Sequence, residues 1–387
     1  SSPPSNTVVA AVGATTVPVG PPTSVTVVQL ATPGQVAISW SPPTTGSAAS
    51  YAVYRGTQLL TGAATSTSFI DIAAPDSLPS GYTVTAVDSS GNTASASATI
   101  TPDWTAPSAP SGLAVTASGT TTATVTWSAA TDAVGVAGYS VTRTDSANSS
   151  VTTPVPATTW SDTGLKPGAT YRYAVTAWDA AGNTSTPSTA VSLAVPVFVE
   201  NFELGSLAPT VWTTPTAGLT VQQATVHSGS WAAEEVSTGS ATWASAQLPG
   251  TYRAIHASAW VYIASRTTSA GFLKLRTASG AYIAYLYVNS TGYLSVRNDA
   301  GNVTHVSTSL VSTGRWHKVE MYIDTNPGGP ITITAVLDGL PVVLAPTVTG
   351  TETLGTSLIG QVVLGDTVAG RTYDIAIDDL TVDTQAP

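Results

Sequence analysis

The sequence predicts an all-β protein built from several small sandwiches, and three observations support this. Short runs alternate apolar and polar residues and are separated by turns of Gly, Pro, Asn and Asp, as at Val36–Trp40 and Tyr82–Val87. This is the pattern of half-buried strands. Helical spacing is nowhere sustained. One passage also occurs twice, with corresponding residues about 90 positions apart.

The repeated passage predicts two sandwiches, at residues 21–103 and 104–196. Each copy contains the same landmarks in the same order: a Trp, a Tyr-x-Val-x-Arg run, an aromatic-x-Asp triplet and an Asp-x-x-Gly-Asn turn. They lie at Trp40, Tyr51–Arg55, Phe69–Asp71 and Asp88–Asn92, and at Trp127, Tyr139–Arg143, Trp160–Asp162 and Asp179–Asn183. A period of this length is the size of one small β-sandwich.

Both copies resemble fibronectin type III domains of the bacterial extracellular kind. The resemblance rests on these landmarks and on the Pro-rich start of each copy. The second copy also has the segment Leu165–Tyr171, which matches a tyrosine corner, whereas the first copy has the shorter Leu78–Tyr82 and lacks an equivalent of Tyr171. The resemblance implies two immunoglobulin-like sandwiches, which usually act as spacers or display modules.

From about Val197 the pattern changes, and residues 197–383 are too long for a third copy. The middle of this region is a meander, in which Phe272–Arg276, Tyr282–Val288 and Tyr293–Arg297 are joined by short turns rich in Gly and Asn. Such turns predict antiparallel pairing. We interpret residues 384–387 as the start of another linker, because Asp383–Pro387 resembles Asp103–Pro107.

This region resembles the concanavalin A-like and laminin-G-like jelly rolls and the related calcium-containing carbohydrate-binding modules. The motifs behind the resemblance are Phe202-Glu203, His227–Ala233, Gly314–Glu320, Val336–Gly339 and Ile375–Leu380. It implies an antiparallel jelly-roll sandwich and a structural calcium ion held by Glu203 and by Asp378 or Asp379, with carbonyl groups near Ser228 and Ser230. In the alternative interpretation, the two Asp residues end a strand and Glu203 is solvated.

A possible sugar-binding surface lies on the strand at Tyr282–Val288. Tyr285 and Tyr287 share one face of this strand, with Lys274 or Arg276 nearby. Sugars stack their apolar faces on aromatic rings while their hydroxyl groups meet polar side chains, so these residues could bind glycan. The alternative is an aromatic pair that only packs on the sheet surface.

The composition limits the classes of function. Asp, Glu, Lys and Arg make up 9% of the chain, against about 25% in an ordinary soluble protein. A net charge of −10 with 12 scattered Lys and Arg residues argues against nucleic acid as a partner. No apolar run is long enough to span a membrane. The chain has no Cys and is rich in Ser and Thr, a composition common at bacterial surfaces, and we expect an extracellular location.

We expect no active site. Glu234 and Glu235 are the only adjacent Glu pair, and in a strand they point to opposite faces, so they cannot flank one glycosidic bond. The four His residues, His227, His256, His305 and His317, have no nucleophile or zinc motif beside them.

Residues 1–20 form a Val-rich arm that includes Val8, Val9, Val12 and Val17. A strand of this kind must pair to satisfy its backbone groups. It either folds back onto the first sandwich or adds to the sheet of a neighbouring subunit.

The low charge, the arm and the linker-like ends favour a non-catalytic structural and adhesive surface protein. It would self-associate as a subunit of a filament, sheath or surface layer that displays the jelly roll. The alternative is a glycan-binding accessory region of a secreted polysaccharide-degrading enzyme. An enzyme accessory region predicts binding to polysaccharide, and a structural subunit predicts self-association through the arm.

Overall fold

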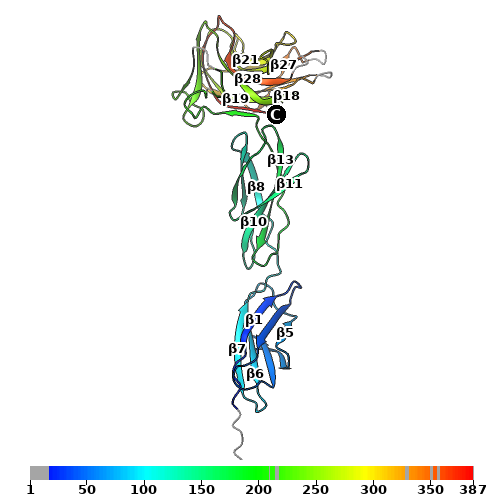
Figure 1. The fold of residues 1–387 in the computed structure, drawn as a ribbon. Coiled ribbons are helices and arrows are strands. Elements are labelled where there is room, and N and C mark those ends of the chain that lie inside the picture. The colour runs from blue at the N-terminus through cyan, green and yellow to red at the C-terminus, as the bar shows by residue number, and fades with distance from the viewer. Residues whose placement is uncertain are drawn as a thin grey trace, which may run out of the picture.

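A computed structural model describes residues 17–208, 210–213, 218–326, 331–348, 352–354 and 358–386. These residues form antiparallel β-sandwiches that follow one another along a long axis (Figure 1). The described residues contain no helix, and therefore none that could cross a membrane. The predicted fold class is confirmed: two immunoglobulin-like sandwiches precede a larger antiparallel sandwich.

The first sandwich packs the sheet β1-β2-β5 against the sheet β4-β3-β6-β7. Its strands are β1 (Thr23–Gln29), β2 (Val36–Ser41), β3 (Ser50–Arg55), β4 (Gln58–Ala64), β5 (Ser68–Asp71), β6 (Ser80–Val87) and β7 (Thr93–Ile100). Their alternating residues supply a small core in which Trp40 meets Tyr51 edge to face, with ring centres 5.3 Å apart.

The second sandwich repeats this topology with the sheets β8-β9-β12 and β11-β10-β13-β14. Its strands are β8 (Ser111–Ala117), β9 (Thr122–Ser128), β10 (Val136–Asp145), β11 (Ser150–Val155), β12 (Thr159–Thr163), β13 (Thr170–Asp179) and β14 (Val191–Ala194). Trp127 and Tyr139 reproduce the edge-to-face pair at 5.4 Å. The internal repeat of the sequence is therefore a repeat of structure.

One polar network is common to both small sandwiches. Tyr82 donates its hydroxyl hydrogen to Asp71 at 2.7 Å, and Arg55 pairs with the same carboxylate at 2.6 Å. In the second copy, Tyr173 donates to Asp162 at 2.8 Å and Arg143 pairs with it at 2.7 Å. The aromatic-x-Asp triplet of each repeat thus supplies a buried carboxylate that joins the two sheets.

The larger sandwich contains two broad sheets. One runs β16-β17-β29-β19-β24-β25-β26, with β15 also paired to β29, and the other runs β18-β28-β20-β21-β22-β23-β27. The strands of the first are β15 (Phe198–Glu200), β16 (Leu219–Gln222), β17 (Ala232–Thr238), β19 (Ala254–Arg266), β24 (Trp316–Asp324), β25 (Thr332–Leu337), β26 (Leu340–Pro341) and β29 (Thr372–Asp383). Those of the second are β18 (Thr242–Tyr252), β20 (Ala270–Thr277), β21 (Tyr282–Val288), β22 (Tyr293–Asn298), β23 (Val303–Leu310), β27 (Leu344–Ala345) and β28 (Ile359–Asp366).

The hydrophobic core of the larger sandwich lies between its two sheets. Leu273, Leu275 and Leu286 from the second sheet and Val261 and Ile377 from the first are all buried there. Each sheet therefore has an inner face that is apolar and an outer face that is free to carry other side chains.

The arm predicted at residues 1–20 is described only from Val17. Val8, Val9 and Val12 lie outside the described residues. Val17 is 64% exposed, whereas Val19 is buried in the core of the first sandwich. The backbone N–H of Gly20 donates to the carbonyl of Thr45 at 2.9 Å, so the chain has joined this sandwich by that point.

Candidate functional site

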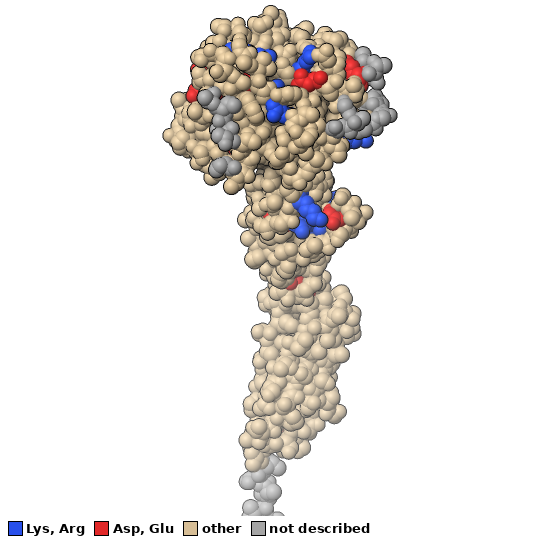
Figure 2. All heavy atoms as spheres, turned by 45° about the horizontal axis from the view of Figure 1, so that its top comes forward, with Lys and Arg blue, Asp and Glu red and all other residues tan. Residues whose placement is uncertain are grey.

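The outer face of the sheet that contains β20 and β21 carries basic and aromatic side chains. Lys274 lies opposite Tyr285 in the pairing of β20 with β21, and Arg276 lies opposite Tyr282. Trp243 extends this group on β18. We call these five residues the aromatic–basic cluster. On the face of Figure 2, charged side chains gather on this larger sandwich, while the first sandwich shows hardly any.

Cations and rings alternate across the cluster. The guanidinium of Arg276 lies 5.0 Å from the ring centre of Trp243 and 4.5 Å from that of Tyr282. The ammonium of Lys274 lies 4.9 Å from Tyr282 and 4.3 Å from Tyr285. These are the distances of cation–π contacts, and they hold the rings in fixed positions.

A β-bulge places Tyr282 in the cluster. Leu275 pairs with Ala284, but the next residue, Arg276, pairs with Tyr282, so β21 contains one extra residue at Ile283. Ile283 and Ala284 both enter the core. The inward–outward alternation of side chains therefore shifts by one residue at the bulge, and Tyr282 lies on the same face as Tyr285. Strict alternation would have turned its ring inward.

The exposure of the rings changes the predicted sugar platform. Tyr282 is 48% exposed, Tyr285 is half-buried, and Tyr287 is only 8% exposed. The rings of Tyr285 and Tyr287 lie 4.8 Å apart on one face, as their alternation requires. The most accessible ring is therefore Tyr282. The sequence reasoning missed it because strict alternation assigns a residue beyond a bulge to the wrong face of the sheet.

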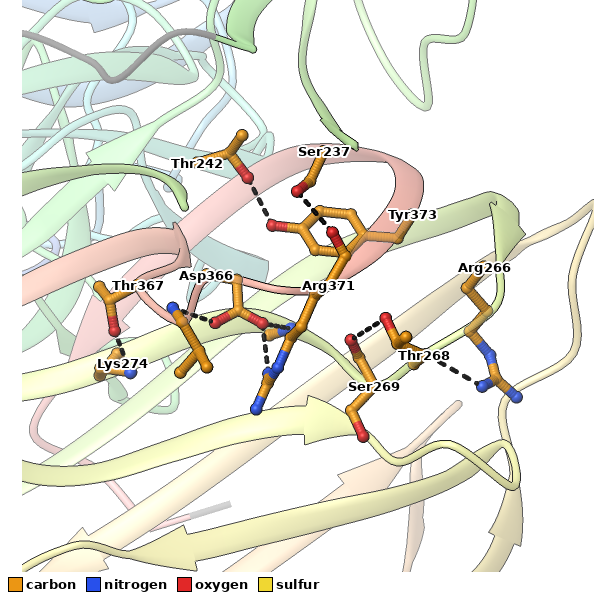
Figure 3. Close-up of polar contacts among 12 residues, drawn as sticks. Ser237, Thr242, Arg266, Thr268, Ser269, Lys274, Asp366, Thr367, Arg371 and Tyr373 are labelled. Atoms are coloured by element: carbon orange, nitrogen blue, oxygen red, sulfur yellow. Dashed lines mark hydrogen bonds and ion pairs between the residues drawn. The ribbon is translucent and has the colours of Figure 1, made fainter. Parts of the chain in front are cut away.

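The segment between β28 and β29 borders the cluster (Figure 3). Lys274 donates from its ammonium to the hydroxyl of Thr367 at 2.5 Å, and burial lowers the pKa of this Lys to about 8. Asp366 accepts a hydrogen bond from the N–H of Gly271 at 2.8 Å and pairs with Arg371. These contacts fix the segment beside β20, so the cluster has a preformed border.

The residues predicted to hold calcium surround one loop. Asp378 accepts hydrogen bonds from the N–H groups of His227 and Ser228 at 3.0 and 3.1 Å. Glu203 accepts from those of Ser230 and Trp231 at 2.9 and 3.1 Å. These carboxylates thus hold the loop through its backbone.

The same carboxylates do not gather into one ligand group. Among the described residues, three carboxylates with an oxygen within 4.8 Å of one another occur elsewhere, at Asp103, Asp132 and Asp179. Asp379 instead contacts the ring of His227 at 2.9 Å and the hydroxyl of Ser228 at 2.8 Å. In the structure these carboxylates accept hydrogen bonds from N–H and O–H groups and do not converge on one point where an ion could bind. Calcium at Glu203, Asp378 and Asp379 stays a prediction.

The adjacent Glu pair lies on opposite faces of β17. Glu235 is fully buried beside Asp366, and neither of its oxygens has a hydrogen-bond partner. Burial, and to a lesser degree the charge of Asp366, raises the pKa of Glu235 well above its ordinary value. Glu234 is half-buried on the other face. A carboxyl sealed in this way cannot reach a substrate.

Each His residue contacts a carboxylate. His227 meets Asp379, His256 meets Glu320, His305 meets Glu352 and His317 meets Asp338, at distances of 2.9, 3.1, 3.0 and 2.9 Å. The sequence showed no such pairing, because each partner comes from a distant strand or loop. That the chain has no active site stays a prediction.

A cavity of about 740 Å³ lies on the other sheet, beside β25 and β26. Its lining is mainly apolar and includes Val336, Val342 and Val343, with Glu320 and Tyr322 at one side. It offers a single aromatic ring and lacks the alternating cations and rings of the cluster. The cluster is therefore the better candidate for binding a polar, ring-shaped ligand.

In a comparison with known proteins, the fibronectin type III domain family matches residues 108–193. Exoglucanase B of Cellulomonas fimi is 39% identical over 170 residues, which cover 41% of this chain and 15% of that protein. Chitinase A1 of Niallia circulans is 32% identical over 232 residues, which cover 57% of this chain and 32% of that protein. The chain thus spans less than a third of each of these curated relatives.

One of the solved structures similar to this chain is a crystal structure of the FN5 domain of Drosophila Lar. It is 22% identical, covers 23% of this chain and 97% of that chain, and has a TM-score of 0.21.

These relatives overturn the leading functional prediction, that of a structural and adhesive subunit of a filament, sheath or surface layer. By their names, the relatives are enzymes that act on glucan and chitin. The prediction failed because scarce charge is equally compatible with spacer sandwiches. Its main support, the arm with Val8, Val9 and Val12, lies outside the described residues, and nothing supports self-association.

Proposed function

We propose that this chain is an accessory region of a secreted polysaccharide-degrading enzyme and binds polysaccharide through the aromatic–basic cluster. The observation that carries the proposal is the exposed ring of Tyr282, held over the guanidinium of Arg276 on the outer face of a sheet. The similarity to an exoglucanase and a chitinase supports the substrate class. The proposed location is extracellular.

The chemistry of the cluster suits a sugar chain. A pyranose ring presents C–H groups on its faces, which pack on an aromatic ring, and hydroxyl groups at its edge, which need polar partners. Tyr282 supplies the exposed ring, Trp243 a second and half-buried one, and the hydroxyls of Tyr282 and Tyr285 supply polar atoms. Lys274 is buried and contacts the rings of Tyr282 and Tyr285, so its role is to position them. Arg276 lies between the two rings and fixes their spacing, so it is a positioning residue.

The arrangement of strands suits an extended ligand. Trp243 is on β18, Lys274 and Arg276 are on β20, and Tyr282 and Tyr285 are on β21. In the sheet order β18-β28-β20-β21, these residues therefore form a row across several strands. A row of rings across a sheet can contact successive sugar units of one chain.

Within this proposal the larger sandwich is a jelly roll of the carbohydrate-binding kind, and the two smaller sandwiches are spacers. Both roles fit a region without catalysis. The spacers would hold the cluster at a distance from a catalytic domain of the same enzyme. The low charge of the first sandwich, whose only basic residue within 21–103 is Arg55, suits a spacer that makes few contacts.

Retention on insoluble polysaccharide tests this function. The full chain is mixed with cellulose, chitin or an inert resin, and the protein left in solution after centrifugation is measured. We expect depletion by at least one of the two polysaccharides and none by the resin. Equal recovery from all three supports would overturn the proposed function.

A further inference from the structure

Three carboxylates meet where the first small sandwich is linked to the second. Asp103 lies in the linker between β7 and β8, Asp132 in the loop between β9 and β10, and Asp179 at the end of β13. One oxygen from each lies within 4.8 Å of the others. Asp103 and Asp179 are 3% and 1% exposed. Three segments of the chain thus bring acidic groups to one nearly buried point.

The negative charge of these three aspartates has no cationic partner among the described residues. Within the described part of the chain, no Lys or Arg forms an ion pair with any of the three. Asp132 accepts hydrogen bonds at Oδ1 from the N–H groups of Val134 and Gly135, both at 2.8 Å, but its Oδ2 is buried and has no hydrogen-bond partner. Asp103 accepts a single hydrogen bond, at Oδ1, from the N–H of Thr105 at 3.3 Å. Such groups are costly to bury unless a cation accompanies them.

The electrostatics agree with the geometry. Burial first, and then the charges of Asp132 and Asp179, raise the pKa of Asp103 above its ordinary value. Asp179 is held in place by Asn183, whose backbone N–H and side-chain amide donate to its two oxygens at 2.9 and 2.8 Å. Asp179 therefore cannot easily turn away from Asp103 and Asp132 to relieve their repulsion.

We infer that Asp103, Asp132 and Asp179 form a divalent cation site with a preference for Ca²⁺. The three aspartates offer only carboxylate oxygens, the ligands of hard cations, and no His or Cys that would favour zinc. Ca²⁺ accepts irregular oxygen shells, whereas Mg²⁺ demands near-octahedral geometry. Ligands from three separate segments suit the more tolerant ion. Water and carbonyl groups would complete the shell.

The position of the site gives the ion a mechanical role. The side chain of Gln29, from the first sandwich, exchanges two hydrogen bonds with the backbone of Asp103, at 2.5 and 2.6 Å. The side chain of Asn183, from the second sandwich, donates to the carbonyl of Asp103 at 3.0 Å. An ion on the carboxylate of Asp103 would tie this shared linker residue to Asp132 and Asp179, and so stiffen the junction visible in Figure 1.

The first sandwich provides an internal control. Asp88 occupies the turn of the first sandwich that corresponds to the turn with Asp179. It accepts hydrogen bonds from the backbone and side chain of Asn92 at 2.9 and 2.8 Å. The loop between β2 and β3, which corresponds to the loop with Asp132, contains no acidic residue. Asp88 therefore has the turn geometry of Asp179 without the two neighbouring aspartates, and no ion is expected there.

The test is calorimetric titration of the chelator-treated full chain with CaCl₂ up to about 10 mM, since extracellular calcium modules bind at about 0.1 to 1 mM. We expect binding that Asp132→Asn weakens at least tenfold and that Asp88→Asn leaves unchanged. Glu203→Gln is measured beside them, because Glu203 is a predicted calcium ligand in the larger sandwich. The Asn amide would also face Asp103 and Asp179 as a donor, so this variant should melt higher than the wild type in chelator. Asp179→Asn serves as a second variant if Asp132→Asn fails to fold.

Two results would overturn the inference. One is the absence of calcium binding by the wild type over the whole range. The other is binding that survives both Asp132→Asn and Asp179→Asn with unchanged affinity. Loss of binding in Glu203→Gln alone would place the ion in the larger sandwich and not at the junction. Polysaccharide retention is measured on the same samples, so failure of this site is distinguishable from failure of the proposed function.

Discussion

The guanidinium of Arg276 lies 4.5 Å from the ring centre of Tyr282 on the outer face of the larger sandwich. Because Trp243 lies on the other side of the same guanidinium at 5.0 Å, one planar cation sets the spacing of two rings. A lysine in its place would bring a compact, strongly hydrated ammonium that cannot stack in this way.

Arg276→Lys should therefore weaken polysaccharide binding while the fold is kept. We expect a loss of about 1 kcal/mol, or roughly fivefold in Kd, which lies within the range of one cation–π contact. Adsorption isotherms on the polysaccharide that retains the wild type measure this change. Arg253→Lys is the matched control, because Arg253 is exposed and pairs with Asp324 away from the cluster. An equal loss in both variants would contradict the assigned role of Arg276.

Glu235 makes the stability of the larger sandwich depend on pH. Its pKa is raised in the folded chain from an ordinary 4.5, so above that pH the unfolded chain releases a proton that the folded chain retains. Unfolding is then favoured as the pH rises from 4.5 toward the folded pKa. Glu235→Gln should flatten this decline and raise the melting temperature at neutral pH. Glu234→Gln, on the opposite face, should change it less. Parallel pH profiles for wild type and Glu235→Gln would rule the mechanism out.

The shared Tyr–Asp–Arg network predicts matched losses in the two small sandwiches. Tyr82→Phe and Tyr173→Phe each remove one hydrogen bond to a buried carboxylate, and each should cost about 2 kcal/mol. Scanning calorimetry should show a different transition moving in each variant. Tyr54→Phe, which removes a hydroxyl from the same first sandwich outside this network, should be neutral. No shift in either network variant would mean that the carboxylates find other donors.

Asp378 is expected to stabilise the loop at residues 227–231 through its hydrogen bonds. Asp378→Ala leaves the N–H groups of His227, Ser228 and Asp379 without their acceptor and should cost about 3 kcal/mol. Asp374→Ala, on the same strand, should cost far less, because among the described residues the carboxylate of Asp374 accepts no hydrogen bond. Melting of both variants is measured with and without chelator. If the loss in Asp378→Ala disappears in chelator, an ion and not the hydrogen bonds stabilises the loop.

The sequence was sufficient to predict the fold class, because strands and turns are local signals. The landmarks at Trp40 and Trp127 recur in the same order, and each occupies the core of its own sandwich. The opposite orientation of Glu234 and Glu235 also follows from alternation alone. Which of the two carboxyls is buried depends on the packing of the sheets, and sequence reasoning could not determine it.

The candidate sites were harder to predict because they depend on register and on distant contacts. Tyr282 joins the cluster only through the bulge at Ile283, which a rule of strict alternation cannot anticipate. Asp103, Asp132 and Asp179 come from three separate segments, and no short motif contains them. Tyr285 and Arg276 were found in advance because both lie on regular parts of their strands.

The central claim is that the exposed ring of Tyr282 binds polysaccharide. Its most direct test compares adsorption isotherms of the full chain, Tyr282→Ala and Tyr293→Ala on one polysaccharide that retains the wild type. Tyr293 is a suitable control because it is 37% exposed on the same sheet but lies outside the cluster. We predict that Tyr282→Ala loses about 2 kcal/mol of binding, or roughly thirtyfold in Kd, while Tyr293→Ala binds like the wild type. Unchanged affinity in a correctly folded Tyr282→Ala would contradict the account.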